Sequence, residues 1–131
     1  MYIEFEVTEL IPAAPDEIYH AWLDSTEHSN MTGTHSEVSD VVGESFEAGD
    51  GYIQGENLEL DPSSRILQSW RTSEFEDSDE DSLLEILLEA HEEGSLITIH
   101  HSRLPANGMQ YRQGWIDYYI TPMKEYFSKN R

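Results

Sequence analysis

The chain has 131 residues, of which 37% are hydrophobic and 11% aromatic, so it is long enough for one domain with its own core. Seven basic and 27 acidic residues give a formal charge of -20, and such a field repels phosphate backbones and anionic lipid surfaces. We therefore expect no binding to nucleic acid or to a membrane. The absence of cysteine excludes disulfides, thiolate nucleophiles and thiolate metal sites.

The first part of the chain predicts one strand followed by two helices. Residues 2–8 alternate between apolar and polar side chains, which is typical of a half-buried strand. A helix is predicted to start at Ala14-Pro15, because proline suits the first helical position and the following acids suit the positive end of the helix dipole. We expect it to end near Asp24 and a second, short helix to begin at Ser25. The first residues lack the basic start and apolar run of a signal peptide, which predicts a cytoplasmic protein.

The middle of the chain predicts consecutive short strands joined by turns. Asp50-Gly51 is a favourable hairpin turn, because glycine adopts a positive φ without steric cost. The almost wholly acidic run at residues 74–81 predicts an exposed loop. Strands are expected at residues 52–60, 65–71, 83–90 and 95–102.

The last third predicts a loop at residues 104–108 and then one long helix. Pro122 lies inside this helix and removes a backbone hydrogen bond, so we expect a kink near Tyr118. The element order predicts a single α+β domain over residues 1–131, with an antiparallel sheet of about six to seven strands covered by that helix. The broad apolar stripe of the helix consists of Tyr111, Trp115, Tyr118, Tyr119, Met123 and Phe127.

Several short motifs occur in an order and at a spacing that are similar to one superfamily. They are residues 15–22 (Pro-Asp-Glu-Ile-Tyr-His-Ala-Trp), 42–46 (Val-Gly-Glu-Ser-Phe), 51–55 (Gly-Tyr-Ile-Gln-Gly), 61–71 and 94–105, followed by Gly114-Trp115. Together they resemble the START-like (SRPBCC, birch-pollen-allergen-like) superfamily. Within it, the motifs are most similar to the C-terminal domain of the activator of the ninety-kilodalton heat-shock protein ATPase. The resemblance implies a helix-grip fold with a cavity, and it supplies no shared catalytic motif.

The cavity under the long helix is expected to hold an apolar or amphipathic small molecule. Strand parity and the helical stripe give the candidate ligand-binding residues, which are Tyr52, Gln54, Glu56, Trp70, Ile99, His101, Trp115, Tyr118 and Tyr119. The alternative that these aromatic side chains simply complete the core stays open at this point.

Glu56 and His101 are the candidate acid–base residues, and they support an alternative function as a cyclase- or hydrolase-type enzyme. If His101 points inward, it could hydrogen-bond a ligand or act as a general base near neutral pH. The alternative is a buried histidine satisfied by a neighbouring tyrosine or glutamate. An inward Glu56 would need a partner, whereas a bulge near Gly55 would turn it to solvent.

The sequence predicts no cofactor and no metal ion. It contains no phosphate-binding glycine loop, nucleophile elbow or two-histidine metal helix. His28 and His35 could form a metal site with Glu37, but we interpret them as surface histidines. A third possible function, contact with a protein partner such as a chaperone, would require an exposed apolar patch. Both a monomer and a homodimer are compatible with the sequence.

Overall fold

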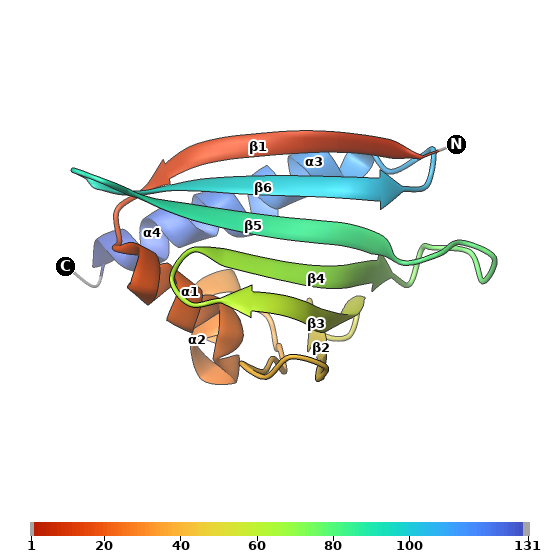
Figure 1. Cartoon of the computed structure of the whole chain (residues 1–131), viewed down its shortest axis with the longest axis horizontal. Helices are drawn as coiled ribbons and strands as arrows, with labels where there is room; N and C mark the ends of the chain where they lie inside the picture. Colours follow the sequence, from red (N-terminus) through yellow and green to blue (C-terminus); the bar gives the residue numbers. More distant parts are fainter. Residues whose placement is uncertain (1, 130–131) are drawn as a thin grey trace.

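The computed structural model describes residues 2–129 and shows an antiparallel sheet covered on one face by helices (Figure 1). The strands are β1 (Ile3–Ile11), β2 (Ser45–Ala48), β3 (Ile53–Asp61), β4 (Arg65–Thr72), β5 (Ser82–His91) and β6 (Gly94–Leu104). The helices are α1 (Pro15–Leu23), α2 (Ser25–Thr32), and a C-terminal helix made of α3 (Gln110–Trp115), the π turn η1 (Ile116–Ile120) and α4 (Thr121–Lys129). The predicted α+β helix-grip arrangement is confirmed.

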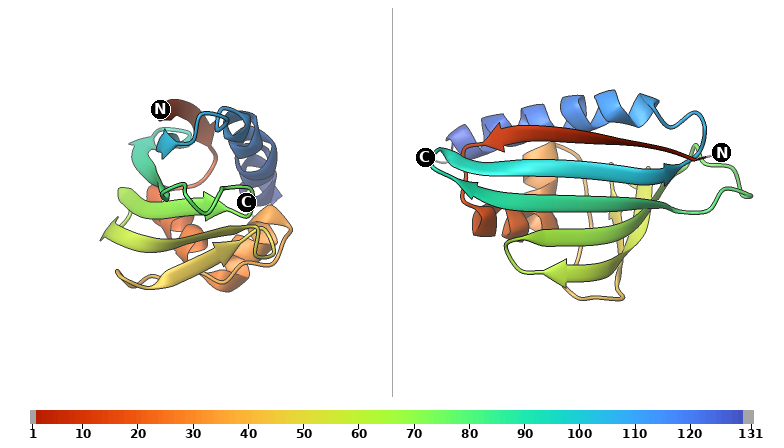
Figure 2. Two further views of the ribbon diagram at one scale, coloured as in Figure 1. Left: turned by 90° about the vertical axis from the view of Figure 1, so that its right-hand side faces the viewer. Right: turned by 45° about the horizontal axis from the view of Figure 1, so that its top comes forward.

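The sheet order, β1-β6-β5-β4-β3-β2, follows from the connections along the chain. Strands β2 to β6 form a meander, as expected for consecutive strands joined by short turns. Strand β1 pairs with β6, so the first and last strands lie side by side. Figure 2 shows the sheet curving around the C-terminal helix, which runs along the inner face beside β1.

The inner faces of β4 and β6 have the predicted parity. On β4, Ile66, Gln68 and Trp70 are buried while the residues between them are half-buried. On β6, Ile99 and His101 are fully buried. The large apolar residues Ile66 and Trp70 on β4, and Ile97 and Ile99 on β6, occupy alternate positions, and this spacing explains why the prediction succeeded.

Strand β3 has the opposite parity to the one predicted. Its inward positions are Ile53, Gly55 and Asn57, so Gln54 and Glu56 lie on the exposed outer face. Gly55 fits here because a Cβ would lie 1.9 Å from the carbonyl oxygen of Ser69 and 2.6 Å from the ring of Phe46. The close approach of these neighbours fixes this register, and the pairing with β4 shifts only later, between Asn57 and Glu59.

The acidic loop between β4 and β5 is anchored at both of its faces. Phe75 is buried, with its ring centroid 6.1 Å from those of both Trp70 and Tyr111. On the other side, the Arg71 guanidinium donates to the carbonyl oxygens of Glu76 and Asp79 and pairs with Asp81 at 2.7 Å. The expectation of an entirely exposed loop is therefore wrong at Phe75, because an apolar ring inside the acidic run packs into the core.

The irregularity predicted near Tyr118 takes the form of a π turn. The backbone N–H of Thr121 donates to the carbonyl oxygen of Ile116, five residues earlier, and Pro122 follows directly. Proline lacks the N–H that would bond to the carbonyl of Tyr118, so a local change in hydrogen bonding is expected there. Tyr119 is buried in this turn, whereas Tyr118 is 71% exposed.

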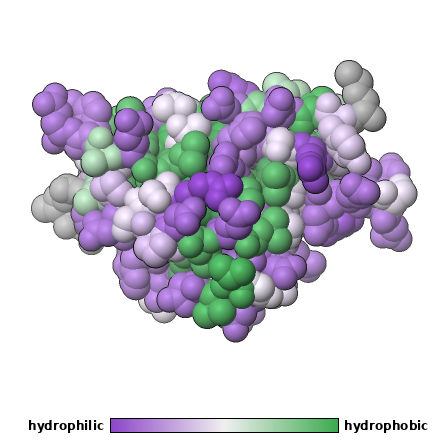
Figure 3. All heavy atoms as spheres, viewed as in Figure 1, coloured by the Kyte–Doolittle hydropathy of each residue, from purple (hydrophilic) through white to green (hydrophobic). Residues whose placement is uncertain are grey.

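The outer face of the sheet mixes hydrophilic and hydrophobic side chains (Figure 3). Leu58 and Leu87 are among the large apolar residues that are exposed. Within residues 2–129, no helix is long and apolar enough to cross a membrane.

Candidate functional site

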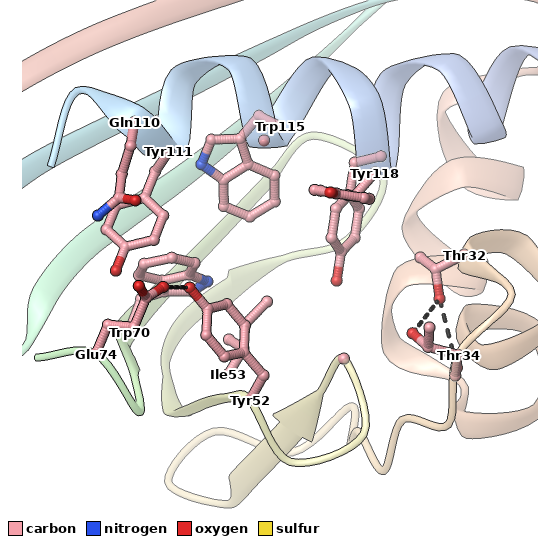
Figure 4. Close-up of a pocket in the computed structure, with 13 residues that line it drawn as sticks. Thr32, Thr34, Tyr52, Ile53, Trp70, Glu74, Gln110, Tyr111, Trp115 and Tyr118 are labelled. Atoms are coloured by element: carbon pink, nitrogen blue, oxygen red, sulfur yellow. Dashed lines mark hydrogen bonds between the residues drawn. The ribbon is translucent and has the colours of Figure 1, made fainter.

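A cavity of about 460 Å³ lies between the inner face of the sheet and the C-terminal helix (Figure 4). Its walls come from the strands, from the helix and from the segments that follow α2 and β4. The lining residues are Thr32, Thr34, Gly49, Tyr52, Ile53, Trp70, Glu74, Gln110, Tyr111, Gly114, Trp115, Tyr118 and Tyr119. Six of these 13 residues are aromatic.

Behind the cavity, His101 holds the indole of Trp115 in place. Trp115 Nε1 donates to His101 Nδ1 at 2.9 Å, so the other ring nitrogen of the histidine carries the proton. His101 Nε2 then donates to Ser82 Oγ at 2.8 Å, and Ser82 Oγ donates to the carbonyl oxygen of Trp70 at 2.8 Å. Burial, and to a smaller degree the neighbouring His100, lowers the pKa of His101 to about 3, so the ring is neutral near pH 7.

His28 holds the side chain of Tyr119 in the same way that His101 holds Trp115, through a hydrogen bond to its polar atom. Its Nδ1 donates to the carbonyl oxygen of Trp22 at 2.8 Å, and its Nε2 accepts a hydrogen bond from the Tyr119 hydroxyl at 2.8 Å. Burial lowers the pKa of His28, although the bond to Trp22 opposes this, and burial raises the pKa of the Tyr119 hydroxyl. The His28 ring and the Tyr119 hydroxyl are therefore both neutral near pH 7, and the hydroxyl is directed to a buried histidine.

Tyr111 completes this side of the cavity through its hydroxyl, which lies 2.7 Å from Thr72 Oγ1. We call Tyr111, Trp115 and Tyr119 the fixed wall. Each member has its polar atom hydrogen-bonded to a buried partner, so the positions of the three rings are fixed. The rings of Trp115 and Tyr119 lie 4.8 Å apart at an angle of 56°.

The mouth of the cavity is formed by Tyr52, Glu74 and Tyr118, which we call the rim. Tyr52 is 37% exposed and Tyr118 is 71% exposed. The Tyr52 hydroxyl donates to the Glu74 carboxylate, and partial burial together with this bond raises the pKa of Tyr52. The rim therefore offers a carboxylate and a phenol ring, Tyr118, to an entering molecule.

Trp70 forms the floor, and its polar atom differs from those of the fixed wall. The side chain is 3% exposed, yet among the described residues its Nε1 has no hydrogen-bond partner. Figure 4 shows this nitrogen at the end of the ring that extends into the space below Trp115. It can therefore donate to an acceptor on a bound molecule.

The structure brings together five of the nine predicted ligand-binding residues. Tyr52, Trp70, Trp115, Tyr118 and Tyr119 all line the cavity. By contrast, Ile99 and His101 are fully buried in the core and do not line it.

Gln54 and Glu56 are displaced to the other face of the sheet, where they line an open depression of about 540 Å³ with Arg71. The inward orientation predicted for them is wrong because β3 has the opposite parity. The predicted acid–base roles therefore lack their geometry: Glu56 faces away from the cavity, and both ring nitrogens of His101 are already bonded.

Several lining residues were missed by the sequence analysis. Tyr111 belongs to the predicted helical stripe, and its four-residue spacing from Trp115 was the available signal. Glu74 was assigned to the exposed acidic loop, and Thr32, Thr34 and Gln110 carry no recognisable pattern.

The structure offers no arrangement for a metal ion among residues 2–129, since no group of three His, Cys, Asp or Glu side chains converges. His28 is buried and bonded, so its interpretation as a surface histidine is wrong. His35 and Glu37 form an exposed pair at 3.9 Å.

Comparisons with known proteins identify the family and support the fold. The family model described as Activator of Hsp90 ATPase homolog 1-like protein matches residues 12–128. The chain belongs to this family. The sequence resemblance to the heat-shock protein activator branch is thereby confirmed.

Solved structures share the fold of this Activator of Hsp90 ATPase homolog 1-like chain. An HSP90 activator from Plasmodium falciparum has a TM-score of 0.86 at 20% identity, and the match covers 96% of each chain. A protein from Mesorhizobium loti has a TM-score of 0.83 at 14% identity, covering 98% of this chain and 99% of the other. A protein from Chromobacterium violaceum has a TM-score of 0.76 at 20% identity, covering 95% and 96%. The comparison with curated proteins gave no significant match.

Proposed function

We propose that the chain binds an apolar or amphipathic small molecule in the cavity between the sheet and the C-terminal helix. The observation that carries the proposal is the fixed wall, whose polar atoms are all bonded to partners behind it. Ligand pockets typically measure about 300–1,000 Å³ and combine apolar walls with a few polar groups. The cavity, at about 460 Å³, is within this range.

The polar groups that orient the ligand are those of the floor and the rim. Trp70 Nε1 is the donor at the bottom of the cavity, and Glu74 is the acceptor at its mouth. These residues take the place of Gln54, Glu56 and His101, the polar members of the ligand-binding set predicted from the sequence. A ligand with an oxygen acceptor at one end of an apolar body matches this arrangement.

A cavity-blocking variant tests the proposal without removing any existing contact. Gly114 lines the cavity from the helix, and a Cβ added there would meet only Tyr118 Cδ2, at 3.9 Å. Gly114→Phe should therefore fill the cavity while the fold is kept. Gly114→Ala is the matched control, because it removes the helical cost of glycine and leaves the cavity open.

The measurement is native mass spectrometry of the purified protein, followed by thermal-shift screening against lipids, aromatic compounds and metabolites. A ligand at about a hundred times its Kd stabilises a protein by about 2.7 kcal/mol, which corresponds to a rise in Tm on the order of 10 °C. We expect this rise in the wild-type protein and in Gly114→Ala, and its loss in Gly114→Phe. An equal rise in Gly114→Phe, or an empty protein with no selective ligand, would contradict the proposal.

A second candidate function is binding to a chaperone. It is supported by the family description, by the similar HSP90 activator from Plasmodium falciparum, and by the exposed Leu58 and Leu87 of β3 and β5. Its test is the ATPase rate of purified Hsp90 with and without the protein. We expect a faster rate that Leu87→Glu abolishes and Gly114→Phe does not, and an unchanged rate rejects this function. Both candidates are proposed for a cytoplasmic protein, as a monomer or a homodimer.

A further inference from the structure

The charges around the cavity have one sign. Among the described residues that line it, Glu74 is the acid and none is Lys, Arg or His. The whole chain adds a formal charge of -20, and an open cavity with low-dielectric walls concentrates such a field. An anionic ligand would therefore have to enter against the field of the protein and beside a carboxylate without gaining a basic partner.

The aromatic rings of the cavity meet at angles instead of forming a flat stack. Trp70 and Tyr111 have centroids 5.0 Å apart with planes at 80°, and Trp70 and Trp115 are 5.7 Å apart at 40°. Tyr119 also lines the cavity from the helix. Tyr118 lies at the rim (Figure 4). The ring of Tyr118 is 71% exposed, so its face is open to a cation, which is the contact by which aromatic rings bind ammonium groups.

The O–H and N–H groups of the aromatic side chains also influence which ligand charge the cavity favours. Because Trp115 and Tyr119 direct their N–H and O–H groups to His101 and His28, these positive edges do not face the ligand. At the mouth, the Glu74 carboxylate remains next to this aromatic surface, and the bond from Tyr52 holds it there.

We propose that the ligand carries a positive charge, on an amine or a quaternary ammonium group, at the rim end of an apolar body. The charged group lies between Glu74 and the face of Tyr118, and the apolar body lies against the fixed wall. This inference rests on the proposed binding function and adds the charge class of the ligand. It assigns to Glu74 and Tyr118 the selection of cations over neutral and anionic molecules.

The nearby cation, Arg71, does not reverse this sign. Its guanidinium lies 5.4 Å from the centroid of Phe75, on the side of the loop away from the cavity. Its charge is paired with Asp81 at 2.7 Å and shared with two backbone carbonyl oxygens. The group is thus neutralised locally by its own loop.

Three naphthalene probes of similar shape and different charge test the inference by isothermal titration calorimetry. They are (2-naphthylmethyl)trimethylammonium, 2-naphthylmethanol and 2-naphthylacetate, measured in about 150 mM salt to screen distant charges. We expect the cation to bind about tenfold more tightly than the alcohol, and the acetate more weakly than both.

Substitutions at two exposed residues then test which side chains cause the preference for cations. Glu74→Gln and Tyr118→Leu should each lower the affinity for the cation by roughly three- to tenfold and change the affinity for the alcohol by less than about twofold. Glu92→Gln is the matched control, because it removes the same charge in the turn at the opposite end of β5. It should leave all three affinities unchanged.

The possible results distinguish the preference for cations from ligand binding in the cavity as such. Equal affinity for the cation and the alcohol, both lost in Gly114→Phe, overturns the charge preference and leaves the cavity as a ligand site. Binding of the alcohol or the acetate alone also overturns it. If no probe binds and the thermal-shift screen finds no ligand, both proposals fail together.

Discussion

The two sides of the cavity differ in what holds their side chains. Each residue of the fixed wall, Tyr111, Trp115 and Tyr119, is buried and bonded to a buried partner. At the rim, Tyr52 and Glu74 bond to each other at the surface, and Tyr118 is 71% exposed. The shape of the fixed wall is therefore set when the protein folds, which lowers the cost of ordering on binding. The rim contributes little to folding, so its residues are available for selecting ligands.

The largest expected effect is on the fixed wall. His101→Ala removes the acceptor of the Trp115 N–H and leaves a void in the core, so we expect a loss of roughly 3 kcal/mol in the free energy of unfolding. Urea denaturation followed by tryptophan fluorescence measures it. The control is His100→Ala on the outer face, where a partly exposed ring contacts Glu4 at 2.9 Å and the expected loss is under about 1 kcal/mol. Similar losses in the two variants would contradict a special role for His101.

The dependence of protein stability on pH should also report on the hydrogen-bonded network of His101. The pKa of His101 is lowered to about 3 in the folded protein, against about 6.5 when unfolded. As pH falls below about 6.5, the unfolded chain binds a proton that the folded protein refuses, so stability is lost progressively down to about pH 3. His28 shifts in the same direction.

The slope from one such proton is about 1.4 kcal/mol per pH unit, so His101 alone should account for roughly 2–3 kcal/mol between pH 6 and pH 4. Denaturation curves at several pH values compare the wild type with His101→Ala, in which the contributions of the carboxylates are shared and cancel. If the stability of both proteins changed with pH in parallel, His101 would take up its proton equally in the folded and the unfolded state, which would contradict this prediction.

Tyr119→Phe is a smaller change to the fixed wall. The ring and its contacts with Trp22 and Trp115 remain, but His28 Nε2 becomes a buried acceptor without its donor. We expect a loss of about 1–2 kcal/mol in the free energy of unfolding. Tyr118→Phe, one residue earlier, removes an exposed hydroxyl and should have no measurable effect. If Tyr119→Phe were equally neutral, the wall would not depend on this bond.

The smallest effect on stability is expected at the rim. Tyr118→Leu removes a ring that is mostly exposed, and the free energy of unfolding should change by less than about 0.5 kcal/mol. Thermal melting without ligand checks this. A large destabilisation would mean that the rim, too, is part of the folded framework, and would weaken the contrast with the fixed wall.

The fold could be predicted where the sequence alternates strongly. On β4, Ile66 and Trp70 are four residues apart, and on β6, Ile97 and Ile99 are two residues apart. This spacing is why the inward faces of both strands were predicted correctly. Strand β3 has polar residues on both faces, and its buried Asn57 has the same appearance in the sequence as a surface residue. Its amide is satisfied by Gln68 and by the carbonyl oxygens of Ser39 and Val41, which sequence reasoning could not anticipate.

The candidate site could be predicted only in part for a similar reason. The aromatic residues of the helix were identifiable from their spacing, because the helix must cover the sheet. The bond between His28 and Tyr119 joins positions 91 residues apart and depends on how α2 meets the C-terminal helix. A histidine in a polar helix gives no sign of such a distant partner.

The π turn determines which residues the C-terminal helix presents to the sheet. Its buried aromatic and methionine side chains, Tyr111, Trp115, Tyr119, Met123 and Phe127, follow one another at intervals of four residues. In a regular helix with 3.6 residues per turn, each such step would rotate the side chain by about 40°, and Phe127 would finish nearly opposite Tyr111. A turn that holds more residues takes up part of this rotation. If Ile116–Ile120 formed a regular turn without losing a residue, the segment before it would therefore be rotated by about 100° relative to Met123 and Phe127, and no single strip of the helix could face the sheet.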